Sequence, residues 1–385
     1  MDHVRIGIIG VGGMGSFHAR YLLEGRVARA SLTAVSDADP ARLEPYKDLK
    51  TFTDSRELIR SGAVDAVLIA TPHYFHTTIG CDALEQGLHV LVEKPISVHK
   101  ADAERLIAAH KRKEQVFAAM FQQRTAPHYR EIKQLVSSGA LGRIQRACWI
   151  ITDWFRPESY YASGTWRATW KGEGGGVLVN QCPHNLDIFQ WIMGMPVRVR
   201  AFCGLGKYHD IEVEDEVTAY LEYENGATAV LVTSTGEAPG TNRLEIAADL
   251  GKLVLEFGQL TFFRNEVPAS EFSRTSPIPF SKPGVTREEI PVEGEGGQHV
   301  EITQNFVDAI LDGVPLIAPA EEGIHSVELA NAMLYSHFVG QTVELPLDGA
   351  AYEAFLQGLI AKSRYNKKVS GTGSMGDMAS SFQKP

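Results

Sequence analysis

Cysteine is scarce in this sequence. Its 385 residues include only four, all far apart, at Cys81, Cys148, Cys182 and Cys203. No two of them form a CxxC pair, which excludes the framework of a small disulfide-stabilised domain and argues against a structural zinc site. We therefore expect buried free thiols in a reducing compartment. The thirteen histidines are scattered as well, and we predict no metal centre.

Long hydrophobic runs and an excess of positive charge are also missing. No uncharged apolar stretch approaches the roughly 18 residues of a membrane-spanning helix. The first residues run directly into a strand pattern without the features of a secretory signal peptide, so we expect a cytoplasmic protein. Lys and Arg number 37 against 47 Asp and Glu, a net charge of −10 with neutral histidine. This balance argues against general affinity for nucleic acid or anionic membranes, and we expect neither as a partner.

What is present is the composition of a folded globular chain. Hydrophobic residues make up 44% and charged residues 22%, and the length suggests two or three domains at roughly 150 residues each. Short apolar runs alternate with amphipathic helical stretches in the first third of the chain, at Val4–Ile9, Leu32–Val35, Ala63–Ala70, Leu88–Val92 and Val116–Phe121. This alternation predicts an α/β fold with a doubly wound parallel sheet covered on both faces.

Strand patterns dominate after about Arg124. An Asn225-Gly226 pair between two β-rich runs is a strong hairpin signal. The second half is therefore predicted to be an α+β domain with a large mixed or antiparallel sheet. Residues 265–298, rich in Pro, Gly, Ser and Glu, look like a long excursion or a lid. We predict domains at 1–123 and 124–369, and a disordered tail at 370–385.

A glycine-rich turn follows the first predicted strand. Residues 10–15 read GVGGMG, a GxGxxG pattern between a buried strand and a helical pattern, and the next strand ends in an acidic residue. In such motifs the glycines permit a tight turn, a close approach of the backbone to a pyrophosphate, and close packing of helix and strand. We expect dinucleotide contacts from Gly10, Gly12, Gly13, Met14, Gly15 and Asp37. A bare glycine-rich turn is the alternative, which this context disfavours.

The acidic residue, Asp37, favours NAD over NADP. Its carboxylate would accept hydrogen bonds from the ribose hydroxyls and repel a 2′-phosphate. Its neighbours Ser36 and Ala38 offer no arginine to bind that phosphate. We therefore predict NAD as the cofactor.

Polar residues follow two further predicted strands, where open α/β sheets bind ligands. We expect these residues to line the cofactor site: Thr71, Pro72, His73, His76, Glu93 and Lys94. A lysine at the end of a buried strand is unusual. Facing the nicotinamide, its ammonium can stabilise a developing alkoxide. A surface lysine at a turn is an equally good interpretation of Glu93-Lys94-Pro95 taken alone.

Together these motifs resemble the Gfo/Idh/MocA family, which includes glucose–fructose oxidoreductase and inositol dehydrogenase. The matching segments occur in family order over roughly residues 4–345, and they are Gly10–Gly15, Asp37, Ala70–His76, Glu93–Pro95 and Gly174–Asp187. The resemblance implies an N-terminal NAD-binding Rossmann domain, a C-terminal domain with a large open sheet, and a homodimer or homotetramer built on the back of that sheet. It also implies oxidation of a secondary alcohol of a sugar or cyclitol, or the reverse reaction.

The resemblance further implies that Lys94, in a Lys-Pro segment whose peptide bond is often cis, and His184 are catalytic. Many members carry Asp four residues before that histidine, whereas this chain has Asn180. An amide orients by hydrogen bonding but cannot accept a proton at neutral pH. Either the enzyme favours ketone reduction or a different alcohol geometry, or Lys94 takes a larger share of the proton transfer. Asn180 and His184 are four residues apart. Either one helix carries both of them on one face, or a helix begins near Pro183 and Asn180 precedes it.

Residues 154–170 are dense in aromatic side chains, whose flat faces suit a pyranose ring. A role in the core or at a subunit interface is the alternative for these rings. We expect substrate contacts from Lys94, Arg124, Trp154, Tyr161, Trp166, Arg167, Asn180 and His184.

These residues predict an NAD-dependent oxidoreductase of a sugar, sugar derivative or cyclitol. A hydride passes between substrate and nicotinamide, while Lys94 stabilises the oxyanion, His184 accepts the hydroxyl proton, and Asn180 positions substrate and His184. Two alternatives remain open. One is an enzyme that recycles bound NAD for elimination, epimerisation or glycoside cleavage. The other is a dinucleotide- or sugar-sensing regulator.

Overall fold

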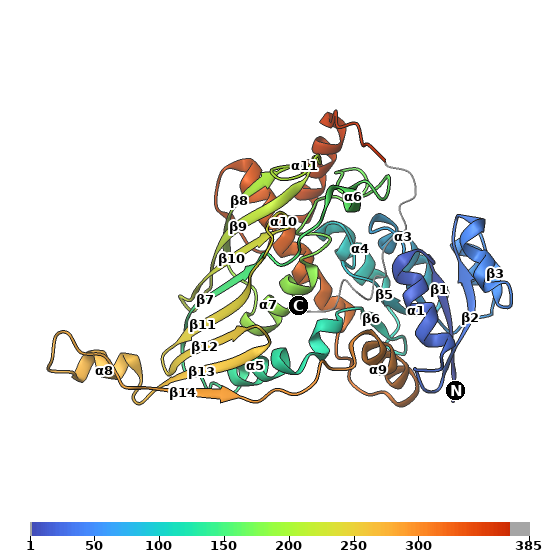
Figure 1. The fold of residues 1–385 in the computed structure, drawn as a ribbon. Helices are drawn as coiled ribbons and strands as arrows, with labels where there is room; N and C mark the ends of the chain where they lie inside the picture. The colour runs from blue at the N-terminus through green and yellow to red at the C-terminus, as the bar shows by residue number, and fades with distance from the viewer. Residues whose placement is uncertain (1, 370–385) are drawn as a thin grey trace.

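A sheet of six parallel strands forms the first part of the chain (Figure 1). The structure, a computed structural model, describes residues 2–369, so the tail predicted at 370–385 lies outside the described residues. In the order β3-β2-β1-β4-β5-β6, the strands are β1 (Val4–Ile9), β2 (Ala30–Ser36), β3 (Lys50–Phe52), β4 (Ala66–Ile69), β5 (His89–Val92) and β6 (Phe117–Ala119). The connecting helices are α1 (Gly13–Leu23), η1 (Pro40–Tyr46), α2 (Ser55–Arg60), α3 (Tyr74–Gln86) and α4 (Lys100–Ala109).

The strand order of this sheet reverses between β1 and β4. The chain leads from β1 to β2 on one side, and β4 pairs with β1 on the other. All four residues of β4 are buried, as expected for a parallel sheet covered by helices. The carboxyl ends of β1 and β4 therefore lie at a topological switch point, where open α/β sheets bind ligands. The predicted doubly wound sheet is confirmed.

A nine-stranded mixed sheet forms the second half, in the order β14-β13-β12-β11-β7-β10-β9-β8-β15. Only β7 and β10 pair in parallel. The strands are β7 (Ile144–Ile151), β8 (Arg198–Leu205), β9 (Glu214–Glu222), β10 (Thr228–Ser234), β11 (Asn242–Ala248), β12 (Gly251–Glu256), β13 (Gln259–Asn265), β14 (Val285–Ile290) and β15 (Val343–Glu344). The predicted Asn-Gly hairpin joins β9 to β10, with Gly226 at φ +82°. The predicted α+β domain is confirmed.

Helices pack on one side of this sheet, between it and the parallel sheet (Figure 1). Helix α10 packs against both β8 and α7, and α7 packs against α5. The helices and short 3₁₀ turns of this half are η2 (Gln122–Thr125), α5 (Pro127–Ser137), α6 (Glu158–Tyr161), α7 (Pro183–Met193), α8 (Ala269–Thr275), α9 (Gln298–Asp312), η3 (Ala320–Glu322), α10 (Gly323–Val339) and α11 (Gly349–Lys362). Within residues 2–369, no helix is both long and apolar enough to cross a bilayer.

The chain returns to the first domain after the second sheet. Helix α9 packs against β1 and β5, and its side chains Ile302, Phe306 and Val307 join the hydrophobic core of the parallel sheet. Residues 118 and 319 form an isolated bridge beside β6. The parallel sheet ends close to the predicted boundary at 123/124, but residues 298–320 belong structurally with the first domain.

The proposed lid at residues 265–298 is wrong. Its central part forms α8 and the edge strand β14, which pairs with β13. Figure 1 places α8 at the end of the molecule farthest from the parallel sheet. A composition rich in Pro, Gly and Ser marks an excursion from the core, but it does not determine where the excursion folds.

The four cysteines are free thiols, but only Cys182 is fully buried. The other three are half-buried, which corrects the expectation that all four belong to the core.

Candidate active site

The glycine turn after β1 leaves no room for a side chain at Gly10 or Gly15. A Cβ atom on Gly15 would lie 1.8 Å from the Gly10 carbonyl oxygen, and one on Gly10 would lie 2.9 Å from the backbone of Ala70. Gly10 also has a φ of +88°, which other residues rarely adopt. Gly12 is the N-cap of α1 and provides no side-chain cap, so N–H groups at the positive end of the helix are available to an anion.

Asp37, after β2, lies against this turn. Its Oδ2 accepts a hydrogen bond from the Val11 N–H (2.9 Å), and its Oδ1 accepts one from the Asp39 N–H (3.0 Å). Arg42, which the sequence analysis missed, lies 3.8 Å from the Asp37 carboxylate and is half exposed. The prediction considered only immediate neighbours, whereas η1 folds Arg42 back toward Gly12.

Thr71 and His73 follow β4 at the same edge of the sheet. The hydroxyl of Thr71 and the Nδ1 of His73 are buried without a hydrogen-bond partner in the described protein. The ring nitrogens of His76 lie 2.8 Å from the carbonyl oxygens of Thr71 and Pro95, so His76 joins the loops after β4 and β5. The glycine clearance, the open helix terminus and these unpartnered groups fit a dinucleotide.

Glu93 and Lys94 follow β5. The Oε1 of Glu93 lies 2.6 Å from the Nε2 of His18, and its Oε2 accepts from the Lys94 N–H. Burial alone would raise the pKa of Glu93, but the hydrogen bond and charge of His18 hold that pKa below its ordinary value. The carboxylate is thus held inside the protein by hydrogen bonds to His18 and to the Lys94 N–H.

Lys94 reaches from the first domain to the second. Its Nζ donates a hydrogen bond to the backbone carbonyl oxygen of Asn180 (2.9 Å), and its peptide bond to Pro95 is cis. Burial lowers the pKa of Lys94, and the carboxylates of Glu93 and Glu173 act in the opposite direction. The lysine therefore lies at the domain junction, which excludes the alternative of a solvated surface lysine.

His184 lies in the first turn of α7, which begins at Pro183 as one of the two predictions had it. Burial lowers the pKa of His184 well below its ordinary value, and the nearby charge of Lys94 lowers it further. Its Nε2 is 3.3 Å from the side-chain nitrogen of Gln122, and its Nδ1 is buried without a partner among the described residues. The imidazole is therefore neutral at neutral pH, and it follows by four residues Asn180, whose carbonyl oxygen accepts from Lys94.

The side chain of Asn180 is engaged by residues that the sequence analysis did not assign. Its Nδ2 donates to the carboxylate of Glu173, and its Oδ1 accepts from the Tyr160 hydroxyl (3.1 Å) and the Gln181 amide (3.2 Å). Gln122, rather than Asn180, contacts His184. The predicted role of Asn180 in orienting His184 is therefore wrong: Asn180 holds Lys94 through its backbone.

The aromatic segment divides into ligand-accessible and structural residues. The guanidinium of Arg167 lies 4.6 Å from the ring centres of both Tyr160 and Trp166. Trp166 in turn packs edge-to-face on His73 of the first domain, 5.6 Å between ring centres. Tyr161, by contrast, is buried and bonds to the Thr235 hydroxyl, so the ring facing the site is its neighbour Tyr160.

Trp154 lies at the edge of the same region. Its indole Nε1 donates to Asn185 Oδ1 (3.2 Å), and the guanidinium of Arg156 lies over its ring. Trp154 is half-buried and keeps part of its surface available to a ligand.

Arg124 has a structural role, and its prediction as a substrate residue is wrong. Its guanidinium is 1% exposed and donates to both carboxylate oxygens of Asp187 (2.8 and 2.6 Å) and to Glu322. These contacts join η2, α7 and the turn before α10. No donor group of Arg124 is accessible to a ligand.

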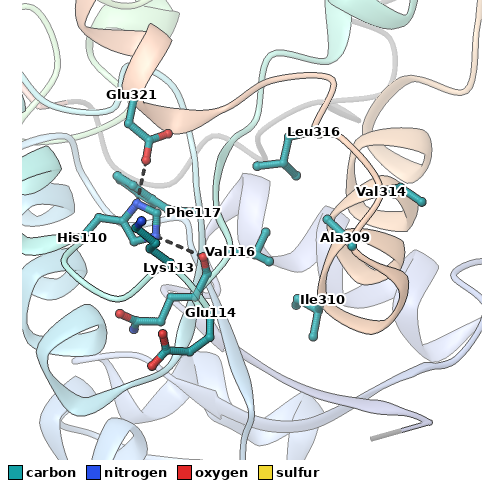
Figure 2. Close-up of a pocket in the computed structure, with 12 residues that line it drawn as sticks. His110, Lys113, Glu114, Val116, Phe117, Ala309, Ile310, Val314, Leu316 and Glu321 are labelled. Carbon is teal, nitrogen blue, oxygen red and sulfur yellow. Dashed lines mark hydrogen bonds and ion pairs between the residues drawn. The ribbon is translucent and has the colours of Figure 1, made fainter.

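A separate cavity lies away from this site. It measures about 520 Å³ and is lined by residues before β6 and at the end of α9 (Figure 2). In it, His110 lies between Glu321 (2.6 Å) and the carbonyl oxygen of Gln115 (3.1 Å). The cavity lies at the start of β6, whereas Lys94 follows the end of β5, and the two strands are parallel. The cavity therefore lies at the edge of the sheet opposite to Lys94.

The fold and the glycine turn define a dinucleotide-binding protein with a Rossmann domain. Residues 4–121 match the NAD-binding Rossmann domain of the GFO/IDH/MocA oxidoreductase family, and residues 129–254 match the family's C-terminal domain. The chain belongs to the Gfo/Idh/MocA family.

Curated relatives and solved structures agree with this assignment. Myo-inositol 2-dehydrogenase of Thermotoga maritima is 27% identical over 262 residues, 65% of this chain and 74% of the relative. The WlbA dehydrogenase of Bordetella pertussis, in complex with NADH and UDP-GlcNAcA, has a TM-score of 0.75 at 22% identity and covers 90% of this chain and 100% of that one. Levoglucosan dehydrogenase with NADH and levoglucosan has a TM-score of 0.74 at 22% identity, with the same coverage.

The structural role of Arg124 predicts a large loss of stability on substitution. Arg124→Met leaves the buried Asp187 without its charged partner, so we expect the free energy of unfolding in urea to fall by about 3–5 kcal/mol. Arg264→Met, which breaks the half-exposed ion pair with Glu288, is the matched control and should cost about 1 kcal/mol or less. Equal, small losses in the two variants would contradict this account.

Proposed function

We propose that this protein is an NAD-dependent dehydrogenase of a secondary alcohol in a sugar, sugar derivative or cyclitol. The observation that carries the proposal is the contact of Lys94, from the first domain, with the carbonyl oxygen of Asn180, four residues before His184 in the second. The relatives described above, two of them solved with NADH, support the cofactor and the substrate class by analogy. A bound nicotinamide supplies the hydride acceptor or donor.

Residues of the chain stabilise the oxyanion and accept the hydroxyl proton. The Lys94 ammonium, held by the Asn180 carbonyl, donates to the alcohol oxygen and stabilises negative charge as it develops there. The neutral His184 accepts the hydroxyl proton on the unpartnered Nδ1. Gln122 can turn its amide oxygen toward Nε2–H, which fixes the tautomer that leaves Nδ1 free. For ketone reduction the same two groups act in reverse.

Lys94 is the most direct test of this mechanism. We expect Lys94→Ala to lower turnover at least about a hundredfold while NADH binding persists, because the variant loses the main donor to the oxyanion. Lys111→Ala removes an exposed lysine far from the site and is the matched control. Oxidation rates on a panel of sugars and cyclitols, together with NADH titration by fluorescence, measure both effects.

Three results separate this proposal from the alternatives. Near-normal turnover in Lys94→Ala refutes the role of Lys94. A protein purified with stoichiometric NAD, which converts a sugar without releasing NADH, favours the cofactor-recycling chemistry. A protein that binds NADH but oxidises no alcohol in a broad panel favours a sensor.

Asp37 supports NAD as the preferred cofactor. Each of its carboxylate oxygens accepts one backbone N–H, which leaves lone pairs for ribose hydroxyls, and its charge opposes a 2′-phosphate. Arg42 beside it provides the positive charge that a 2′-phosphate would need once the carboxylate is removed.

Asp37→Ser should therefore change the cofactor preference. We expect the dissociation constant for NADH to rise about tenfold, the scale of losing a hydrogen bond to a charged group, and that for NADPH to fall. Titration calorimetry with both dinucleotides measures the ratio. Asp39→Ser removes the neighbouring, more exposed carboxylate as a control. An unchanged ratio in Asp37→Ser would argue that Asp37 does not select the cofactor.

The outer face of the nine-stranded sheet supports a homo-oligomer. Directly paired residues form rows across it with an apolar centre. In one row Tyr220, Val230 and Cys148 lie between Arg200 and Glu245, and in the next Phe202, Thr218, Val232 and Ile150 are followed by Arg243. Phe202 and Tyr220 are 61% and 43% exposed. An apolar sheet face of this kind suits burial against a second copy of the chain.

A charge at the centre of this face should weaken the oligomer. We expect Val230→Glu to shift the mass in sedimentation velocity toward the monomer, because an unpaired carboxylate is costly to bury. Lys50→Glu, on the edge strand β3 of the other sheet, is the control. A wild-type protein that sediments as a monomer rules out the proposed oligomer.

A further inference from the structure

Glu173 is a carboxylate buried beside the candidate active site. It directly precedes Gly174 and is 2% exposed. One of its oxygens accepts from the Asn180 amide, and the other accepts from the Ala168 N–H (2.6 Å). A buried carboxylate is costly unless it is hydrogen-bonded and balanced by positive charge. Burial raises the pKa of Glu173 above its ordinary value, and the charge of Arg167 together with the two hydrogen bonds opposes that shift.

These two hydrogen bonds connect Glu173 to two segments beside the site, one at Asn180 and one at Ala168. Through Asn180, the carboxylate fixes the residue whose carbonyl oxygen receives the Lys94 ammonium. Through Ala168, it fixes the turn that carries Trp166 against His73 of the first domain. Glu173 is almost fully buried, so a substrate cannot reach its carboxylate, and any effect of Glu173 passes through other residues.

The charge of Glu173 also acts on Lys94. The groups whose charges act on this ammonium are two carboxylates and two guanidinium groups: Glu93, Glu173, Arg167 and Arg156. Four imidazoles couple to it as well, each with a pKa lowered by burial: His73, His76, His184 and His299. Glu93 is already paired with His18. Glu173 is therefore the carboxylate by which the second domain stabilises the lysine's charge.

We propose that Glu173 is a positioning residue that holds the Lys94–Asn180 contact and keeps Lys94 protonated. The Glu173 carboxylate and the Asn180 amide work as one unit, in which one member carries the charge and the other donates to it. The proposal rests on the proposed function for the reaction that Lys94 serves. It makes no claim about which alcohol is oxidised.

The first test removes the charge and keeps the shape. In Glu173→Gln the Lys94 ammonium loses a nearby anion, so its pKa falls further. Because the mechanism needs the protonated lysine, activity should be lost at lower pH, and we expect the alkaline limb of kcat/KM to move down by about one pH unit. A purely structural role would lower the rate without moving that limb.

The second test exchanges the two groups. Asn180→Asp alone places two carboxylates in contact, and we expect kcat/KM to fall at least about tenfold. The double variant Glu173→Gln/Asn180→Asp restores one carboxylate and one amide in reversed order. The introduced amide then donates to the introduced carboxylate and accepts from the Ala168 N–H, and Tyr160 donates to that carboxylate as it did to the Asn180 amide oxygen. We expect the double variant to recover activity to within about threefold of the wild type and to restore the alkaline limb.

Glu321→Gln is the matched control, since it removes a carboxylate from the distant His110 pair. Thermal unfolding of each variant identifies loss of fold. If Glu173→Gln does not fold, the comparison of Asn180→Asp with the double variant still tests the proposal. Recovery of kcat/KM in the double variant requires that the carboxylate and the amide act as a pair.

A measurement that does not depend on catalytic turnover can test the role of Glu173 independently of the proposed function. The pH dependence of Lys94 acetylation by acetic anhydride, quantified by peptide mass spectrometry, reports the titration of its amine directly. A downward shift in Glu173→Gln supports the proposal even if no alcohol is ever oxidised. An unchanged Lys94 titration, or a double variant no more active than Asn180→Asp, overturns it.

Discussion

The hydrogen bond from the Lys94 ammonium to the Asn180 carbonyl oxygen is the contact on which the candidate active site depends. It joins the loop after β5 to the segment before α7, and so brings the two domains to one point. A buried ammonium is unfavourable by itself, and the site offsets that cost from both sides: Glu93 acts from the first domain and Glu173 from the second. Burial lowers the pKa of His184, the Lys94 charge adds to this effect, and the imidazole is thus in the neutral state that a proton acceptor needs.

The surrounding architecture holds these groups at fixed positions. Arg124 and Asp187 form a buried ion pair that fastens α7, and with it His184, to the chain leaving the first domain. Helix α9 returns to the parallel sheet and buries its apolar face there. The domains are therefore linked by a buried ion pair and by the return of α9 to the core of the first domain, as well as by the chain at residues 119–127. A site assembled from both domains benefits from such rigidity, because a small displacement of one domain would move the Lys94 ammonium relative to the His184 imidazole.

Local patterns predicted the fold well. The glycine turn, the strand ends and the Asn-Gly hairpin depend on backbone conformation and hydrophobic spacing, which the sequence carries directly. The errors concern side-chain partners that are distant in sequence or set by the path of a loop. Arg124 finds Asp187 in another element, and η1 brings Arg42 back to Asp37. Whether Tyr160 or Tyr161 faces the site depends on a one-residue difference in a short helix, which no periodicity resolves.

The most direct test of the central claim is a crystal structure of the ternary complex with NADH and a substrate from the sugar and cyclitol panel. The account predicts one secondary hydroxyl or carbonyl oxygen within hydrogen-bond distance of both the Lys94 Nζ and a ring nitrogen of His184, with its carbon against the nicotinamide ring. A substrate oxygen that meets neither nitrogen, or nitrogens that contact different parts of the ligand away from the nicotinamide, would contradict it.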